Sequence, residues 1–245
     1  MQPDEYRKMA EVEDRMWYYR ALHRLVTWAL TRELGSDGSV LDAGCGTGGL
    51  LRFMRATQPA WQLSGVDLSP LACPLAQERS GATIVQGSVA QLPFANESFD
   101  ALTSCDVLCQ LAEPATALRE FHRVLRPGGW IVLHVPAYSW LWSYHDDAVE
   151  SKRRFTRPEL RQMFAGQGWQ IQWATYRNTL PFPLVVLRRK IFPPTDPGSD
   201  VRLYPAPLEV MFNAMMALEH GWFSSGGRLP YGSSVLVVGR KPKVA

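Results

Sequence analysis

Short apolar segments alternate with helix-like segments between residues 40 and 137, and this alternation constrains the fold of the 245-residue chain more than any other feature. The apolar segments are short and end in turn residues, so we predict that they are strands. Strands that alternate with helices form βαβ units, which require a parallel sheet covered by helices. The predicted strands are 40–43, 61–69, 82–87, 99–107 and 130–137, and the predicted helices between them are 48–56, 69–80 and 114–126.

The segments on either side of this region have other patterns. Apolar residues recur every three or four positions over residues 4–34, which predicts a helical segment that ends at Gly35. A helix over 158–166 is expected after Thr156, and strands are expected at 169–176 and 233–241. About fifty-five residues rich in proline and aromatic side chains separate these two strands. That length exceeds an ordinary connection and predicts an inserted cap.

The stretch VLDAGCGTGG at Val40–Gly49 follows the first predicted strand. Gly44, Gly46 and Gly49 satisfy G-x-G-x-x-G, and Asp67 lies about twenty residues further on, as in a dinucleotide fingerprint. Glycines let the backbone turn tightly against any ligand. Asp42 discriminates between ligands, because its carboxylate would repel a pyrophosphate and attract a sulfonium and an ammonium group. The turn therefore favours S-adenosylmethionine, and a nicotinamide-dependent oxidoreductase is the less favoured alternative.

Four segments in order resemble the motifs of class I S-adenosylmethionine-dependent methyltransferases. They are VLDAGCGTGG, LSGVDLS, QGSVAQLPFANESFDALTSCDVL and REFHRVLRPGGWIVLHVP, and the resemblance covers residues 38–136. The subgroup is that of small-molecule enzymes similar to the quinone-biosynthesis methyltransferases. The resemblance implies an α/β, Rossmann-like, doubly wound seven-stranded sheet whose last strand is antiparallel. It divides the chain into an N-terminal helical lid (1–36), a cofactor-binding domain (37–175), an inserted substrate cap (176–232) and a final strand with its tail (233–245).

The resemblance also assigns roles to individual residues of the cofactor site. Asp67 would accept hydrogen bonds from both ribose hydroxyls, Leu68 would pack on the adenine, and Cys105 would present its carbonyl to the methionine amine. Ser88 stands where the family usually has aspartate, a departure that weakens the expected bond to the adenine amino group. The expected cofactor-binding residues are Trp17, Tyr18, Asp42, Ala43, Gly44, Gly46, Gly49, Asp67, Leu68, Ser88, Val89 and Cys105.

The residues around the methyl acceptor are less clearly marked. Related enzymes often have a glutamate–histidine pair after the fourth strand, where this chain has Cys109 and Gln110. The segment WLWSYHD, followed by two arginines and an aromatic residue, resembles a bacterial methyltransferase subgroup. We predict His145 as a general base oriented by Asp146 or Asp147, although a helix cap is an alternative role. The expected substrate-binding residues are Gln110, Trp140, Trp142 and Arg154.

The composition and the remaining motifs favour methyl transfer to an oxygen or nitrogen of a small, apolar or aromatic acceptor, including lipid-like molecules and secondary metabolites. A net charge of +3 is low for a nucleic-acid enzyme, and the (Asp/Asn)-Pro-Pro-aromatic motif of base-amino methyltransferases is replaced by SCDV. An RNA or nucleobase methyltransferase remains the main alternative, and a non-catalytic cofactor-binding protein is a further one. The four cysteines have no metal-binding spacing, so no metal site is expected. The sequence predicts a cytoplasmic protein without a membrane-spanning segment. The stretch PLVVLRRKIF at residues 183–192 combines apolar and basic residues, which is compatible with binding to a membrane surface.

Overall fold

In the computed structural model, which describes residues 3–193 and 199–243, the described strands form one seven-stranded sheet. The strand order is β3-β2-β1-β4-β5-β7-β6, and β7 is antiparallel to both of its neighbours while the remaining pairs are parallel. The predicted doubly wound α/β fold with an antiparallel last strand is therefore confirmed. The strands are β1 Gly38–Ala43, β2 Trp61–Asp67, β3 Thr83–Gln86, β4 Phe99–Cys105, β5 Leu125–Pro136, β6 Gln170–Arg177 and β7 Ser234–Arg240.

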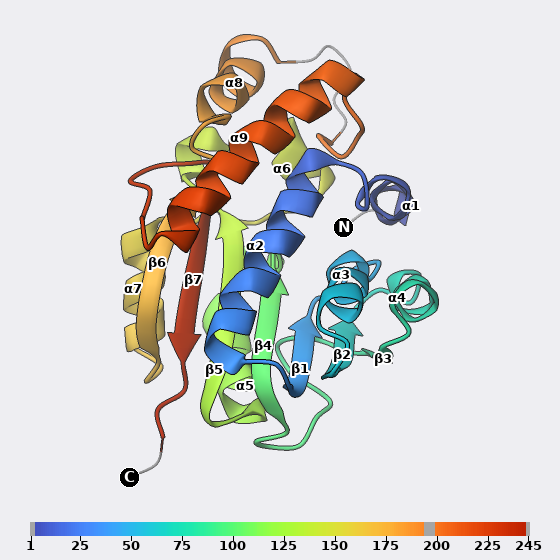
Figure 1. Cartoon of the computed structure of the whole chain (residues 1–245), viewed down its shortest axis with the longest axis vertical. Coiled ribbons are helices and arrows are strands. Elements are labelled where there is room, and N and C mark those ends of the chain that lie inside the picture. The colour runs from blue at the N-terminus through green and yellow to red at the C-terminus, as the bar shows by residue number, and fades with distance from the viewer. Residues whose placement is uncertain (1–2, 194–198, 244–245) are drawn as a thin grey trace.

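Helices cover both faces of the sheet (Figure 1). On one face α2, α3, α4 and α9 pack against the strands, and on the other α5 and α7 do so. The α-helices are α1 Pro3–Val12, α2 Trp17–Leu34, α3 Gly49–Thr57, α4 Ala72–Ser80, α5 Pro114–Val124, α6 Tyr144–Ala148, α7 Arg157–Ala165, α8 Phe182–Val186 and α9 Ala206–Ser224, and the shorter turns are η1 Leu108–Gln110, η2 Ser139–Leu141 and the π-helical η3 Leu187–Ile191.

The core lies on both sides of the sheet, and β7 shows how the sequence builds it. Successive side chains of a strand point to opposite faces. Val235 and Val237 therefore join the cluster under α5 and α7, while Leu236 and Val238 join the cluster under α2 and α3. A strand that is buried on both faces reads as a continuous apolar run, as SVLVVG does.

The N-terminal segment differs from the single helical pattern predicted over 4–34. It forms two helices, α1 and α2, separated by a turn at residues 13–16, where Met16 is extended. The cause lies in the tertiary structure. Glu13 is buried, accepts a hydrogen bond from Thr47 and pairs with Arg79, so the chain is held at this point and α1 turns away from the axis of α2.

Local signals placed other boundaries well. Thr156 begins α7 with a capping box in which its hydroxyl accepts from the Glu159 amide, and Gly35 ends α2 at a φ of 90°. The predicted end of α5 was two residues late, because Leu125 already pairs with Phe99 of β4 as part of β5. Of the helices in the described parts of the chain, none has the length and apolar character needed to cross a bilayer.

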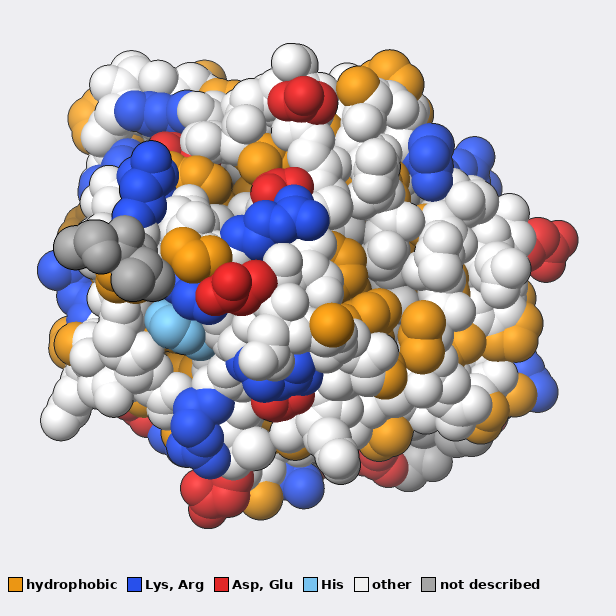
Figure 2. Space-filling view, turned by 90° about the horizontal axis from the view of Figure 1, so that it is seen from below, with side chains coloured by type: hydrophobic (Ala, Val, Ile, Leu, Met, Phe, Trp, Pro, Cys, Tyr) orange, Lys and Arg blue, Asp and Glu red, His pale blue; other side chains and the backbone are white. Residues whose placement is uncertain are grey.

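The parallel strands end at the edge of the sheet that lies uppermost in Figure 1, and α1, α6 and α8 gather above this edge. The opposite end, seen in Figure 2, carries basic and acidic side chains intermixed without a concentration of either charge. In parallel sheets, ligands bind outside the carboxyl ends of the strands. A ligand site is therefore expected at the upper edge of the sheet.

Candidate functional site

A cavity of about 530 Å³ opens at the carboxyl edge of the sheet. Its wall combines the turns that follow β1, β2, β3 and β4 with the segment after β5, with α1 and the start of α2, and with parts of residues 178–234. Its volume lies in the range of small-molecule sites. Residues that are far apart in the sequence thus face one cavity.

The glycine turn after β1 forms the floor of the cavity at Gly44 and Gly46. Gly44 has a φ of 85°, and a Cβ atom there would overlap the side chain of Val107. Gly46 has a φ of 53° and donates its backbone N–H to Asp67 over 2.8 Å. Positive φ angles together with a close approach explain why glycine is required at this turn.

Asp42 lies at the end of β1 with only 3% of its surface exposed, yet it lines the cavity. Thr103 donates a hydrogen bond to Oδ1 over 2.9 Å. Burial raises the pKa of Asp42 to about 7, although the bond from Thr103 opposes that shift. A buried carboxylate without a cationic partner is costly. A cationic ligand group beside Asp42 would therefore be stabilised.

Asp67 ends β2 and holds the glycine turn in place. Its Oδ2 accepts from Gly46, and its Oδ1 accepts from the amide of Ser69 over 2.9 Å. The hydroxyl of Tyr6 in α1 lies 3.4 Å from the same Oδ1, so α1 covers this carboxylate. Each carboxylate oxygen has two lone pairs, so these contacts leave one lone pair of Oδ2 for a ligand hydroxyl, and displacement of the long Tyr6 contact would free a second on Oδ1.

Most of the other residues predicted to bind the cofactor also line the cavity, and two do not. Ala43 is fully buried in the core beneath α5, and a Cβ at Gly49 would collide with the carboxylate of Glu13 at the start of α3. Ala43 and Gly49 therefore support the glycine turn through packing and do not face the cavity. The predicted residues in the wall are Trp17, Tyr18, Asp42, Gly44, Gly46, Asp67, Leu68, Ser88, Val89 and Cys105.

Trp17 begins α2 and contributes a donor to the wall. Its ring stacks on Phe212 of α9 with centroids 4.8 Å apart, and its amide donates to Glu209 over 2.8 Å. The indole Nε1 is buried, and no acceptor for it is found in the described residues. A buried indole N–H usually has a partner, so Trp17 is suited to a ligand acceptor.

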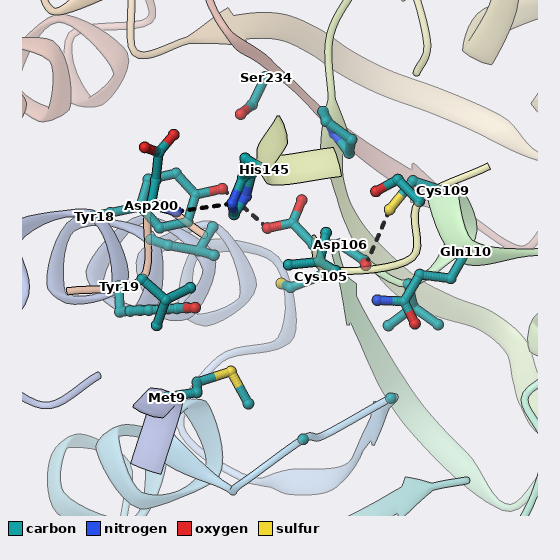
Figure 3. A pocket seen from close by; sticks show the side chains of 18 of the residues that line it. Met9, Tyr18, Tyr19, Cys105, Asp106, Cys109, Gln110, His145, Asp200 and Ser234 are labelled. Atoms are coloured by element: carbon teal, nitrogen blue, oxygen red, sulfur yellow. Dashed lines mark hydrogen bonds between the residues drawn. The ribbon is translucent and has the colours of Figure 1, made fainter. Parts of the chain in front are cut away.

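A half-buried network behind Cys105 was not predicted from the sequence. Asp106 accepts from the Tyr18 hydroxyl over 2.9 Å (Figure 3). It also lies 3.0 Å from His134 Nδ1. Arg177 lies behind, 3.4 Å from His134 Nε2. Burial raises the pKa of Asp106, but His134, Tyr18 and Arg177 together hold it below its usual range. Asp106 is thus a permanent carboxylate in the cavity wall, and its position directly after β4 was the signal for it.

His145 reaches the cavity from α6, but neither predicted carboxylate orients it. Asp146 instead pairs with Arg154 over 2.7 and 2.9 Å and accepts from the amide of Ser143, while Asp147 accepts from the indole of Trp142. The partner of His145 is the backbone N–H of Asp200, which lies 3.1 Å from Nδ1 (Figure 3). The expected orientation of His145 by Asp146 or Asp147 is therefore corrected. Asp146 does take part in the start of α6, as the third residue of a capping box whose N-cap is Ser143, so the alternative role as a helix cap applies to Asp146 in part.

The four predicted substrate residues separate into two pairs. Gln110 and Arg154 line the cavity, whereas Trp140 and Trp142 lie outside its wall. Trp140 is 53% exposed and contacts Tyr138 and Phe182 on the outer surface. The segment after β5 turns at η2, so its two tryptophans face away from the site while His145 faces into it.

The insertion between β6 and β7 closes the cavity with α8 and η3. Its basic residues point inward, because Arg188 and Arg189 line the cavity and both bind the carboxylate of Asp200. Its apolar residues recur at helical spacing and point outward: Leu180, Leu184, Leu187 and Ile191 are between 39% and 60% exposed. Leu184 also contributes to the cavity wall.

Comparison with known proteins identifies relatives of the central part of the chain. Residues 41–133 match the family model described as a methyltransferase domain. Over 154 residues the chain is 27% identical to the demethylmenaquinone methyltransferase of Staphylococcus aureus, an alignment that covers 58% of this chain and 61% of that enzyme. The chain thus spans less than two thirds of the length of the curated relatives it matches.

Solved structures resemble the whole described fold. A putative methyltransferase in complex with the Trm112 methyltransferase activator of Haloferax volcanii has a TM-score of 0.65 and 22% identity, covering 98% of this chain and 95% of that one. The geranyl diphosphate C-methyltransferase of Streptomyces coelicolor A3(2) has a TM-score of 0.60 and 17% identity, covering 88% and 74%. At these identities the likeness shows a shared fold.

Proposed function

We propose that the protein transfers a methyl group from S-adenosylmethionine to a small, apolar or aromatic acceptor, because residues 41–133 match the methyltransferase-domain family and the chain is similar to the demethylmenaquinone methyltransferase. The acceptor atom is an oxygen, a nitrogen or, as the name of the geranyl diphosphate C-methyltransferase indicates for that neighbour, a carbon.

The observation that carries this proposal is the buried carboxylate of Asp42 beside the glycine turn. A sulfonium or ammonium group that binds there gains an opposite charge at a buried carboxylate, where electrostatic attraction is stronger than in water. Asp67 adds acceptor oxygens suited to two neighbouring ribose hydroxyls, at the other side of Gly46. A pyrophosphate at the same turn would face the carboxylate of Asp42 and be repelled.

The reaction is an in-line displacement at the methyl carbon. A lone pair of the acceptor forms a bond to that carbon while the carbon–sulfur bond breaks, and the electron pair returns to sulfur to give S-adenosylhomocysteine. An acceptor O–H, N–H or C–H loses its proton. In such a displacement the protein contributes mainly by holding the two reactants in line, and the shared cavity provides the place for both.

The cavity wall supports an apolar acceptor. Leu184 and Val185 of α8 lie at the wall together with Val149. Leu184 also belongs to the row of exposed apolar side chains described above, which continues through Leu187 to Ile191. An apolar molecule that enters along this stripe would remain in contact with apolar side chains. This arrangement suits the lipid-like members of the proposed acceptor class.

The choice of cofactor is tested by isothermal titration calorimetry with S-adenosylmethionine, S-adenosylhomocysteine, NAD and NADP. We expect saturable binding of the first two and no heat of binding with the dinucleotides, because the charge of Asp42 repels a pyrophosphate. Saturable binding of NAD with no binding of S-adenosylmethionine would replace this proposal with the oxidoreductase alternative.

The affinity for S-adenosylmethionine is expected to fall by about tenfold between pH 7 and pH 5.5. The pKa of Asp42 is about 7 in the free protein, and only its carboxylate form attracts the cationic ligand, so binding must expel a proton at lower pH. The ligand amine stays protonated throughout this range.

Titrations of the wild type and of Asp42→Asn over this pH range make the comparison. Glu13 and Asp67 face the same cavity and are unchanged in the variant, so its affinity shows their contribution. We expect Asp42→Asn to bind more weakly at pH 7 and to vary less with pH. Equal pH dependence of both proteins would contradict the assignment.

A further inference from the structure

The hydrogen bond of His145 determines which of its ring nitrogens carries the proton. Nδ1 accepts the backbone N–H of Asp200 over 3.1 Å, and an accepting nitrogen must have a free lone pair. The neutral ring therefore carries its proton on Nε2. His145 lines the cavity, so its Nε2–H is the polar group that this ring offers to a ligand.

The groups that surround His145 favour the neutral ring with its proton on Nε2. Asp200 accepts from Tyr144 over 2.7 Å and binds Arg188 and Arg189, and Asp146 is occupied by Arg154. Neither carboxylate is thus free to pair with an imidazolium. Burial lowers the pKa of His145 to about 4, and Arg189 and Arg154 add to this effect against Asp200 and Asp146.

The same arrangement opposes the role of a general base. A base would have to accept a proton at Nε2, and the proton already there would have to move to Nδ1. Two N–H groups, those of Nδ1 and Asp200, would then face each other across 3.1 Å. Losing the bond to Asp200 while placing two donors together is unfavourable in a buried site.

We propose that His145 donates a hydrogen bond from Nε2 to an oxygen of the methyl acceptor, so that the acceptor is a molecule with a carbonyl, enolate or phenolate oxygen facing α6. This inference rests on the proposed methyl transfer. Arg188 and Arg189 share the single carboxylate of Asp200, which leaves an excess of positive charge near this position and favours an oxygen that carries negative charge. A proton that the acceptor loses passes to water.

The protonation of His145 can be measured without any acceptor, by nitrogen NMR of the full-length protein labelled with ¹⁵N-histidine. The spectrum of His145→Leu identifies the His145 signals by their absence. We expect a lone-pair shift for Nδ1 and a protonated shift for Nε2, both unchanged between pH 5.5 and 8. A protonated Nδ1, or titration of the ring near neutral pH, would overturn the inference.

Binding of a matched pair of probes tests the oxygen preference in the presence of S-adenosylhomocysteine. The probes are 1-tetralone, which has a carbonyl oxygen, and tetralin, the same skeleton without it. We expect the wild type to bind the ketone about three- to tenfold more tightly, as for one neutral hydrogen bond. Glutamine can place an amide N–H near the position of Nε2 but has no useful basicity, so His145→Gln should keep most of this preference, whereas His145→Leu should lose it.

His122→Gln is the matched control, because His122 lies on α5, away from the cavity, beside Trp169. Its preference for the ketone should equal that of the wild type. An unchanged preference in His145→Leu would remove His145 from acceptor recognition even if methyl transfer is established. Failure to bind S-adenosylhomocysteine would instead contradict the proposed function, while the NMR result on His145 would stand independently of it.

Discussion

Arg154→Met is expected to lower the free energy of unfolding by about 3–5 kcal/mol, the usual effect of removing one partner of a buried ion pair. The side chains of Arg154 and Asp146 are only 1% and 2% exposed and are joined by two hydrogen bonds. Arg154 also donates to the carbonyl of Ala137. Without it, Asp146 keeps a buried charge that, among the described residues, is hydrogen-bonded by the amide and hydroxyl of Ser143. Urea denaturation followed by tryptophan fluorescence measures the change.

The neighbouring arginine provides the control for this prediction. Arg153 is 37% exposed and pairs with Glu159, so Arg153→Met should cost less than about 1 kcal/mol. The double variant Asp146→Asn with Arg154→Met removes both charges and should recover part of the loss. A small effect of Arg154→Met alone would mean that Asp146 gains another partner or reaches water.

Asp67→Ala is expected to weaken binding of S-adenosylmethionine by about 1.5–3 kcal/mol, which corresponds to roughly a 10- to 150-fold higher Kd. The substitution removes the proposed acceptor of the ribose hydroxyls. It also frees the amides of Gly46 and Ser69, which now donate to the two carboxylate oxygens. Calorimetry of the variant and the wild type gives the ratio of dissociation constants.

Asp100→Ala is the matched control for Asp67. Asp100 lies near the opposite end of the sheet in β4, where it accepts from Ser39 and Arg126. This variant loses hydrogen bonds of the same kind but should bind the cofactor as tightly as the wild type. Melting temperatures of both variants establish that they are folded, and an unaltered Kd in folded Asp67→Ala would place the ribose elsewhere.

The amino-acid sequence by itself determined the parts of this protein that depend on short stretches of chain. The alternation of strands and helices, the glycine turn after β1 and the cap at Thr156 are read from neighbouring residues, because periodicity, φ angles and caps act over a few positions. The strand-end rule then placed Asp42 and Asp67 at one cavity without knowledge of their distance.

Only the tertiary structure decided which distant groups meet. The turn between α1 and α2 depends on the pairing of Glu13 with Arg79, and His145 depends on the amide of Asp200, 55 positions away. Nothing in the local sequence specifies these partners. The packing of the insertion and of α1 over the sheet brings these partners together. In the folded chain Trp140 is also exposed on the surface, and Asp146 forms its ion pair with Arg154. Side-chain chemistry was visible in the sequence, but the use of each side chain was set by contacts that form when the whole chain folds.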